Sequence, residues 1–315
     1  MGHLPRRAFL ASGLATSMSG AASVPLIDCH IHLFDQTRPQ GAPYSGGGPN
    51  KLPSLPARYR KLAQPLGIAG AIVVEASPWI EDNLWALQVM EPAPMMLGLI
   101  GNLQPEKPEF REYLERYHRN PLFLGLRYGN IWGYSLVRQS ANPAFLAGLK
   151  LLEQAGLAFD TANPRQDLLE AVLRVTDRVP GLRVIVDHLP GLFWRLDKTE
   201  KPALDATLRE LAQRPKVYIK VSAAMRVRDG QGLTDASLYK PVFDQIFDTF
   251  GEDRLIFGSD WPNADAVDNL PAIVQIAQQY FRGKNQAANE KFFWRNSMAA
   301  YRWRPRDSGQ PSAQG

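Results

Sequence analysis

Short apolar segments alternate with longer amphipathic ones along most of the chain. Eight runs of mainly apolar residues predict β-strands, at residues 26–34, 70–77, 96–103, 122–130, 156–164, 183–191, 217–224 and 254–262. The segments between them repeat their apolar residues with a helical period, at 79–91, 106–119, 142–154, 165–179, 201–213, 237–250 and 266–281. Eight strand-then-helix units in about 250 residues predict a (β/α)8 barrel.

The same alternation also suits an open, doubly wound parallel sheet. No glycine-rich phosphate-binding sequence follows the first predicted strand, which disfavours the dinucleotide-binding version of that fold. Segment 36–56 is rich in proline and glycine and has little apolar period, so we expect an elaborated loop there. We find no internal repeat or linker. We therefore expect one domain over 24–304 and a disordered tail over 305–315.

The first 23 residues have a different pattern. Arg6 and Arg7 precede Phe9, and a stretch of small and apolar residues then ends near Ser23, where a signal peptidase could cut. The paired arginines favour a twin-arginine export signal and a periplasmic location, and the alternative is an N-terminal helix of the folded domain. The stretch is too short and too weakly apolar for a membrane span, and no later segment qualifies.

Composition excludes some classes of protein. The only cysteine, Cys29, cannot form an intramolecular disulfide, so a large core must stabilise the fold. Without Arg6 and Arg7 the formal charge falls from +5 to +3, and no run of basic residues is present. Nucleic-acid binding therefore has little support. The oligomeric state leaves no signal in the sequence.

Polar residues gather near the ends of the predicted strands. In a barrel these ends meet at one mouth, where polar side chains more often perform chemistry than hold the fold. The strand ends carry, in chain order, His30, His32, Glu75, Ser77, Arg127, Asp160, His188, Lys220, Ser222 and Asp260. Because side chains alternate along a strand, His30 and His32 should face the mouth together.

Four of these segments carry a family resemblance, namely DCHIH at 28–32, VDHLP at 186–190, IKVS at 219–222 and FGSDWP at 257–262. Together and in this order they resemble the amidohydrolase superfamily. Within it they are most similar to the amidohydrolase-related branch that holds the L-fuconolactonases and the 2-pyrone-4,6-dicarboxylate lactonases. The resemblance implies a lactone-opening hydrolase in which His30, His32, His188 and Asp260 face the substrate.

One feature departs from members of the superfamily that hold two metal ions. The resemblance implies that such members use a bridging lysine or glutamate on strand four and a histidine on strand five, whereas this chain has Arg127 and Asp160 there. We therefore expect at most one ion. Three imidazoles and a carboxylate, from His30, His32, His188 and Asp260, suit Zn²⁺. Some lactonases of this branch work without metal, and the sequence leaves both possibilities open.

The expected mechanism is hydrolysis of a cyclic ester. Ionised Asp260 takes a proton from water as general base, and the water attacks the lactone carbonyl. His30, His32 and His188, or one ion that they hold, polarise that carbonyl. Substrate binding is assigned to Arg127 and Lys220. No serine or cysteine lies in a nucleophile-elbow pattern, so a covalent intermediate is not needed.

Residues near these motifs receive structural interpretations. Asp187 should point away from His188, and Cys29 should point away from the histidines into the layer between sheet and helices. His118 lies in a helical stretch and should be solvated. Trp132 and Tyr134 either line the mouth or pack within a loop.

Two other functions remain open. A metal-dependent decarboxylase of the aminocarboxymuconate-semialdehyde type uses much the same ligands and would hold its metal tightly. An exported binding protein that lost catalysis is the second alternative, although a pure binder needs no general base.

Overall fold

The computed structural model describes residues 24–44, 52–191, 200–222, 227–228, 231–263 and 270–312. The predicted export signal at 1–23 lies outside these residues, and the predicted periplasmic location stays a prediction. Within the described ranges, no helix combines the length and the apolar character needed to cross a membrane.

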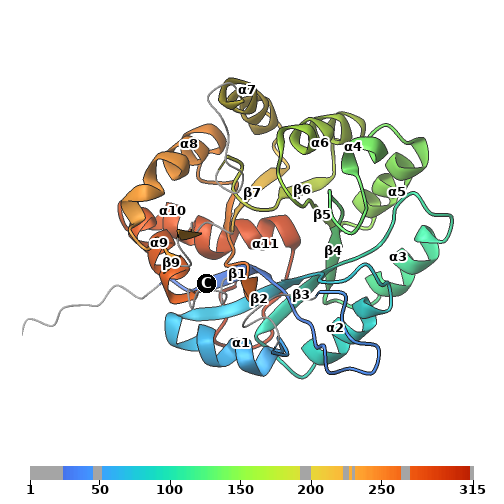
Figure 1. Ribbon diagram of the computed structural model, residues 1–315, viewed down its shortest axis with the longest axis horizontal. Coiled ribbons are helices and arrows are strands. Elements are labelled where there is room, and N and C mark those ends of the chain that lie inside the picture. Colours follow the sequence, from blue (N-terminus) through green and yellow to red (C-terminus); the bar gives the residue numbers. More distant parts are fainter. Residues whose placement is uncertain are drawn as a thin grey trace, which may run out of the picture.

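Eight parallel strands form one sheet in the order β1-β2-β3-β4-β5-β6-β7-β10 (Figure 1). Their bounds are Leu26–Ile31 for β1, Ile68–Val74 for β2, Met96–Gly101 for β3, Phe123–Arg127 for β4, Ala158–Asp160 for β5, Arg183–Val186 for β6, Val217–Val221 for β7 and Leu255–Phe257 for β10. All eight lie within the predicted strands or overlap them. A short antiparallel pair, β8 (Val227–Arg228) and β9 (Gln231–Gly232), stands apart from the sheet.

The sheet closes on itself between its first and last strands. The N–H of Asp260 donates to the carbonyl of His30 at 2.8 Å, and the N–H of His32 donates to the carbonyl of Trp261 at 2.7 Å. Ile31 also bridges Trp261 in parallel. Strand order and closure confirm the predicted (β/α)8 barrel and exclude the open doubly wound sheet.

Helices surround the sheet, and the seven predicted ones are all present. The outer helices are α1 (Pro56–Ala63), α2 (Asp82–Met90), α3 (Phe110–His118), α4 (Leu136–Gln139), α5 (Pro143–Gln154), α6 (Gln166–Arg178), α7 (Lys201–Ala212), α8 (Lys240–Phe250) and α9 (Leu270–Arg282). Short 3₁₀ turns lie at Gln64–Leu66 and Ala236–Leu238. Local chemistry explains their limits: Asn142 caps α5 by accepting from the N–H of Ala144 at 3.0 Å, and Pro143 occupies the first turn.

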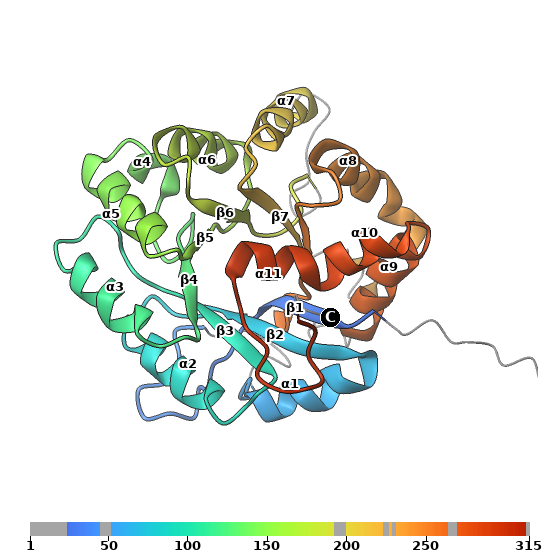
Figure 2. The ribbon, with the colours of Figure 1, turned by 180° about the vertical axis from the view of Figure 1, so that it is seen from behind.

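The predicted elements omit the C-terminal helices. They are α10 (Gln286–Glu290), a π-helix, η5 (Lys291–Arg295), and α11 (Asn296–Tyr301). Figure 2 shows α11 lying across one end of the ring of strands. The side chains of Trp294 and Tyr301 are buried there.

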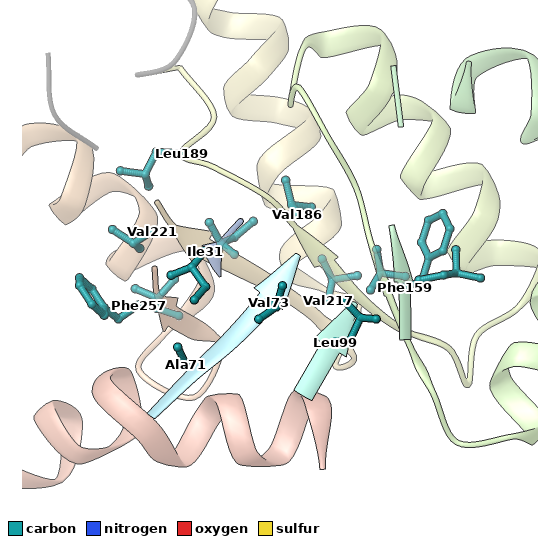
Figure 3. Packing of buried hydrophobic residues seen from close by; sticks show 14 of the residues in the cluster. Ile31, Ala71, Val73, Leu99, Phe159, Val186, Leu189, Val217, Val221 and Phe257 are labelled. Atoms are coloured by element: carbon teal, nitrogen blue, oxygen red, sulfur yellow. The ribbon is translucent and has the colours of Figure 1, made fainter. Parts of the chain in front are cut away.

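Two apolar clusters fill the fold. The larger lies between strands and outer helices, and Figure 3 shows part of it, including Ile31, Val73 and Phe257. The smaller joins apolar side chains from strands all around the ring with the C-terminal helices, and it includes Ile27, Ile72, Leu97, Leu124, Ile185, Ile256, Trp294 and Tyr301. Side chains from opposite strands meet only inside a barrel, so this second cluster is the barrel floor.

Two sequence-based expectations differ from the structure. Cys29 lies in the floor cluster rather than outside the sheet, because the register of β1 shifts between Asp28 and Ile31 and interrupts the alternation. The tail was expected to be disordered from 305, but through 312 it packs against the barrel. Arg306 donates to the carbonyls of Met90, Ala93 and Met96 at 2.8–3.0 Å, and the side chain of Gln310 is buried.

Candidate active site

His30 and His32 lie together inside the barrel, as the sequence predicts. Both are buried, and their ring centroids are 4.9 Å apart. His188 joins them from the end of β6, with its ring 4.7 Å from that of His30. His30 and His32 come from β1 and its end, and His188 follows β6; these two strands are not neighbours in the sheet, so barrel closure brings the three imidazoles together.

Asp260 sits among the three rings. Its Oδ1 lies 3.3 Å from His32 Nε2 and 3.6 Å from His30 Nε2, and it accepts from the side-chain amide of Asn263 at 3.1 Å. Burial alone would raise the pKa of Asp260, but His188, His32 and His30 together hold it well below its ordinary value. The carboxyl group is therefore ionised at neutral pH.

The backbone at two of these residues is unusual. Asp260 has φ +66° and His188 has φ +69°, in the left-handed region that non-glycine residues rarely enter. Such strain persists only where the surroundings enforce it, and it concentrates at functional sites. At both positions it redirects a side chain just after a strand ends.

Hydrogen-bond partners fix the proton of His32. Its Nδ1 lies 3.0 Å from the carbonyl of Val74 and 3.1 Å from that of Glu75. Carbonyl oxygens only accept, so Nδ1 carries the hydrogen. In the neutral ring Nε2 then carries a lone pair, which faces an oxygen of Asp260. Two acceptors this close are favourable only with a cation or a proton donor between them.

His188 has a matching arrangement. Its Nδ1 lies 2.9 Å from Ser222 Oγ, which leaves Nε2 for the site. Burial lowers the pKa of His188 to about 4, although Asp260 and Asp187 oppose this. At neutral pH the ring is uncharged, as a metal ligand or a hydrogen-bond donor to a carbonyl requires.

Three of the four predicted metal ligands form a compact set. His30, His188 and Asp260 each offer one ligand atom, and these atoms all lie within 4.8 Å of one another. Neither ring nitrogen of His30 has a hydrogen-bond partner among the described residues, although the ring is fully buried. Such a donor set fits one divalent ion. His32 is outside this set and reaches it through Asp260.

A buried network of charges lies beside the histidines. Asp187 Oδ1 is 2.8 Å from Lys220 Nζ, and its Oδ2 is 2.9 Å from Arg127 Nε. Lys220 also donates to Asp160 at 2.6 Å. The expectation that Asp187 faces away was wrong: β6 ends at Val186, and with the alternation broken there Asp187 contacts the site as well as His188.

The two predicted substrate ligands are both enclosed by this network. Lys220 is fully buried, and burial would lower its pKa, but Asp160 and Asp187 raise it. This placement fits a fixed cation within the protein rather than a direct substrate contact. Arg127 is nearly as buried, with Nη1 3.5 Å from Glu75 Oε1.

Glu75 stands at a predicted strand end, and the sequence assigns it no role. Its Oε2 accepts from the indole N–H of Trp132 at 2.8 Å, and burial raises its pKa in spite of Arg127. Trp132 is thereby fixed against the site. Tyr134 instead stacks on Tyr128, with ring centroids 5.0 Å apart, so its part is packing.

Two further residues support the site without facing it. Asp28 accepts from the N–H of Ser259 at 2.8 Å and from Tyr59 Oη at 2.6 Å, and so ties β1 to the segment that carries Asp260. At Gly258 a Cβ would lie 2.8 Å from His30 Cβ, which is too close for any other residue. Both lie within the motifs DCHIH and FGSDWP, and that position is their signal in the sequence.

Comparisons with known proteins identify relatives of this barrel. A family model described as amidohydrolase matches residues 27–303. L-fucono-1,5-lactonase of Burkholderia ambifaria is 28% identical over 251 residues, covering 75% of this chain and 80% of that protein. The 4-sulfomuconolactone hydrolase of Rhizobium radiobacter is 26% identical over 251 residues, covering 76% and 77%.

The fold has solved counterparts as well. A crystal structure of an amidohydrolase from Burkholderia multivorans, with bound zinc, has a TM-score of 0.78 at 21% identity, and the match covers 89% of this chain and 100% of that one. The family match spans nearly all of the described barrel, from the first histidine pair to the C-terminal helices. The chain therefore belongs to the amidohydrolase family, and it is a hydrolase.

Proposed function

We propose that this protein opens a lactone by adding water across its ester bond. The observation that carries the proposal is the meeting of an ionised carboxylate with three imidazole rings inside a closed barrel. Asp260 Oδ1 is the shared point, 3.3 Å from His32 Nε2 and 3.6 Å from His30 Nε2. Relatives named as lactonases support this choice of ester.

The reaction assigns one role to each group. Asp260 takes a proton from water, and the water oxygen forms a bond to the lactone carbonyl carbon. The ring C–O bond then breaks, and the proton held by Asp260 passes to the leaving oxygen, which gives a hydroxy acid. The imidazoles of His30, His32 and His188 orient the carbonyl and the attacking water.

His30, His188 and Asp260 are the residues that would hold a divalent ion, with His32 beside them. Such an ion, when bound, polarises the carbonyl and lowers the pKa of water. The chain's own part is to keep the nitrogen lone pairs of uncharged rings directed at one point.

Charge within the site favours a neutral, hydroxyl-rich lactone of a sugar acid over a dicarboxylate. The guanidinium of Arg127 lies 2.9 Å from Asp187 and 3.5 Å from Glu75, so two carboxylates already share its charge. Lys220 is likewise held between Asp160 and Asp187. Among the described residues of the site, an anionic substrate would meet an excess of carboxylates, whereas hydroxyl groups could donate to Glu75.

A pH-indicator assay tests the proposal, because opening a lactone releases acid. We expect acid release above the spontaneous rate from sugar-acid lactones and much less from lactones that carry carboxylate or sulfonate groups. The matched control is Asp260→Asn protein, which should follow the spontaneous rate. Acid release equal in wild type and Asp260→Asn for every lactone would refute the proposed function.

The same assay with a chelator tests whether a metal ion takes part in the reaction. If one ion acts in the reaction, chelation should collapse the rate and Zn²⁺ should restore it; if the imidazoles act alone, the rate should change little. Elemental analysis of the purified protein should find at most one ion per chain. Two tightly bound ions per chain would contradict this account, and one ion together with decarboxylation would favour the decarboxylase.

A further inference from the structure

Asp187 lies enclosed among charged side chains beside the histidines. It is fully buried, and two cations approach it from different sides, Lys220 Nζ at 2.8 Å from Oδ1 and Arg127 Nε at 2.9 Å from Oδ2. A permanent negative charge therefore lies directly beside His30.

The interactions that hold Asp187 extend to the far end of the barrel. Lys220 donates to Asp160 Oδ2 at 2.6 Å, and the same oxygen accepts from Tyr301 Oη at 2.8 Å. Tyr301 is the last residue of α11, which lies across the barrel floor (Figure 2). A chain of charged and hydrogen-bonded side chains thus runs from the C-terminal helix to Asp187.

His30 stands between two carboxylates. Its Nδ1 lies 3.7 Å from Asp187 Oδ1, and its Nε2 lies 3.6 Å from Asp260 Oδ1. The ring is fully buried, and in its neutral form an imidazole has one N–H to give. The position of that hydrogen decides whether Nε2 enters the site as a donor or as a lone pair.

The contacts of the two carboxylates determine which ring nitrogen of His30 carries the hydrogen. Asp260 Oδ1 accepts from Asn263 at 3.1 Å and lies 3.3 Å from His32 Nε2, whereas each oxygen of Asp187 has one cation beside it. Both ring nitrogens of His30 are without a hydrogen-bond partner among the described residues, and each carboxylate oxygen of Asp187 can accept one more donor. A buried N–H without a partner is costly, and a hydrogen bond to a nearby carboxylate removes that cost. Nδ1 is the nitrogen of His30 that faces Asp187.

We propose that Asp187 is the positioning residue of His30: it keeps the ring hydrogen on Nδ1 and turns the Nε2 lone pair toward Asp260. The inference rests on the proposed function, in which Nε2 of His30 faces the reacting groups. A carboxylate behind a site histidine fixes the tautomer and the ring orientation, and loss of such a partner typically costs 10–100-fold in activity or metal affinity.

The test compares two substitutions in the buried network. Asp187→Asn removes the charge beside His30, and Asp160→Asn is the matched control, because Asp160 contacts Lys220 and Tyr301 but not His30. Long-range ¹H–¹⁵N spectra of histidine-labelled protein, as purified and after chelation, report the tautomer of each ring. We expect His30 as the Nδ1–H tautomer in wild type and Asp160→Asn, and a shift toward Nε2–H in Asp187→Asn.

Kinetics provide the second measurement. On a lactone that the wild type opens, Asp187→Asn should lower kcat about 10–100-fold with KM changed less than about threefold. An Nε2–H tautomer of His30 in wild type would overturn the inference, even if Asp187→Asn failed to fold. So would an unchanged tautomer in folded Asp187→Asn. The spectra need no substrate, so failure of every lactone would refute the proposed function without deciding this inference.

Discussion

The barrel interior has two layers that are equally buried but differ in chemistry. The floor is apolar, with Ile27, Ile72, Leu97 and Ile185 packed under Trp294. Above it lies a charged layer of five side chains: Glu75, Arg127, Asp160, Asp187 and Lys220. All five are at most 7% exposed, although charged residues are almost never buried unless they are paired.

The difference teaches what each layer contributes. Apolar packing has no direction, so the floor stabilises the fold in proportion to the area it buries. Buried ion pairs gain little net stability over apolar residues of the same shape, because desolvation offsets their attraction. The charged layer instead fixes angles and charge beside the histidines. Substitutions in the charged layer should therefore change activity as well as stability, whereas substitutions in the floor should change stability alone.

The largest expected effect separates chemistry from stability. Asp260→Asn should lower turnover about 10²–10⁴-fold, because an amide cannot take the water's proton. The fold should persist, since Asn263 and the backbone contacts of residue 260 remain. Initial rates, with circular dichroism for the fold, measure this. Asp253→Asn, at an exposed carboxylate in the turn before β10, is the control. More than a tenth of wild-type activity in Asp260→Asn would remove Asp260 from the role.

Sequence reasoning could reach the barrel because it depends on period and order, which short apolar strands and amphipathic helices carry plainly. It could also bring together His30, His32, His188 and Asp260, because they stand at strand ends. It failed for Cys29 and Asp187, since alternation holds only while the strand is regular. The register shift in β1 and the left-handed backbone at His188 depend on tertiary contacts and leave no local pattern.

The next effect tests the charged layer for stability. Lys220→Met leaves Asp160 and Asp187 buried without their shared cation and should cost about 3–5 kcal/mol of unfolding free energy. Urea unfolding measures the loss. Lys220→Met with Asp160→Asn should recover part of it, because one uncompensated charge is then gone. Additive losses in the double variant would show that Asp160 and Lys220 are not coupled.

A pH effect of somewhat smaller size follows from His188. Burial holds the pKa of its folded form at about 4, below the ordinary 6.5, so the unfolded chain binds more protons between these values. The contribution of His188 to the unfolding free energy is therefore complete above pH 6.5, and it falls by about 3 kcal/mol as the pH drops to 4.

Urea unfolding at pH 7 and pH 4.5 measures this dependence. His188→Gln should make it shallower, because buried His30 still contributes its own dependence, whereas His118→Gln, which replaces an exposed histidine on α3, should leave it as in wild type. An equal pH dependence in wild type and His188→Gln would assign the acid sensitivity to other groups.

The smallest effect belongs to the floor. Ile72→Val removes one methylene from a fully buried side chain and should cost about 0.5–1.5 kcal/mol of unfolding free energy. Because the floor acts through packing and does not fix the angle of any histidine, kcat and KM of the folded protein should stay within about twofold of wild type. Leu62→Ala on the exposed side of α1 is the control for a loss of apolar side chain without burial. A large fall in kcat for Ile72→Val, at an unchanged unfolding free energy, would contradict this prediction. The floor would then also position the site, and the two layers would not differ in function.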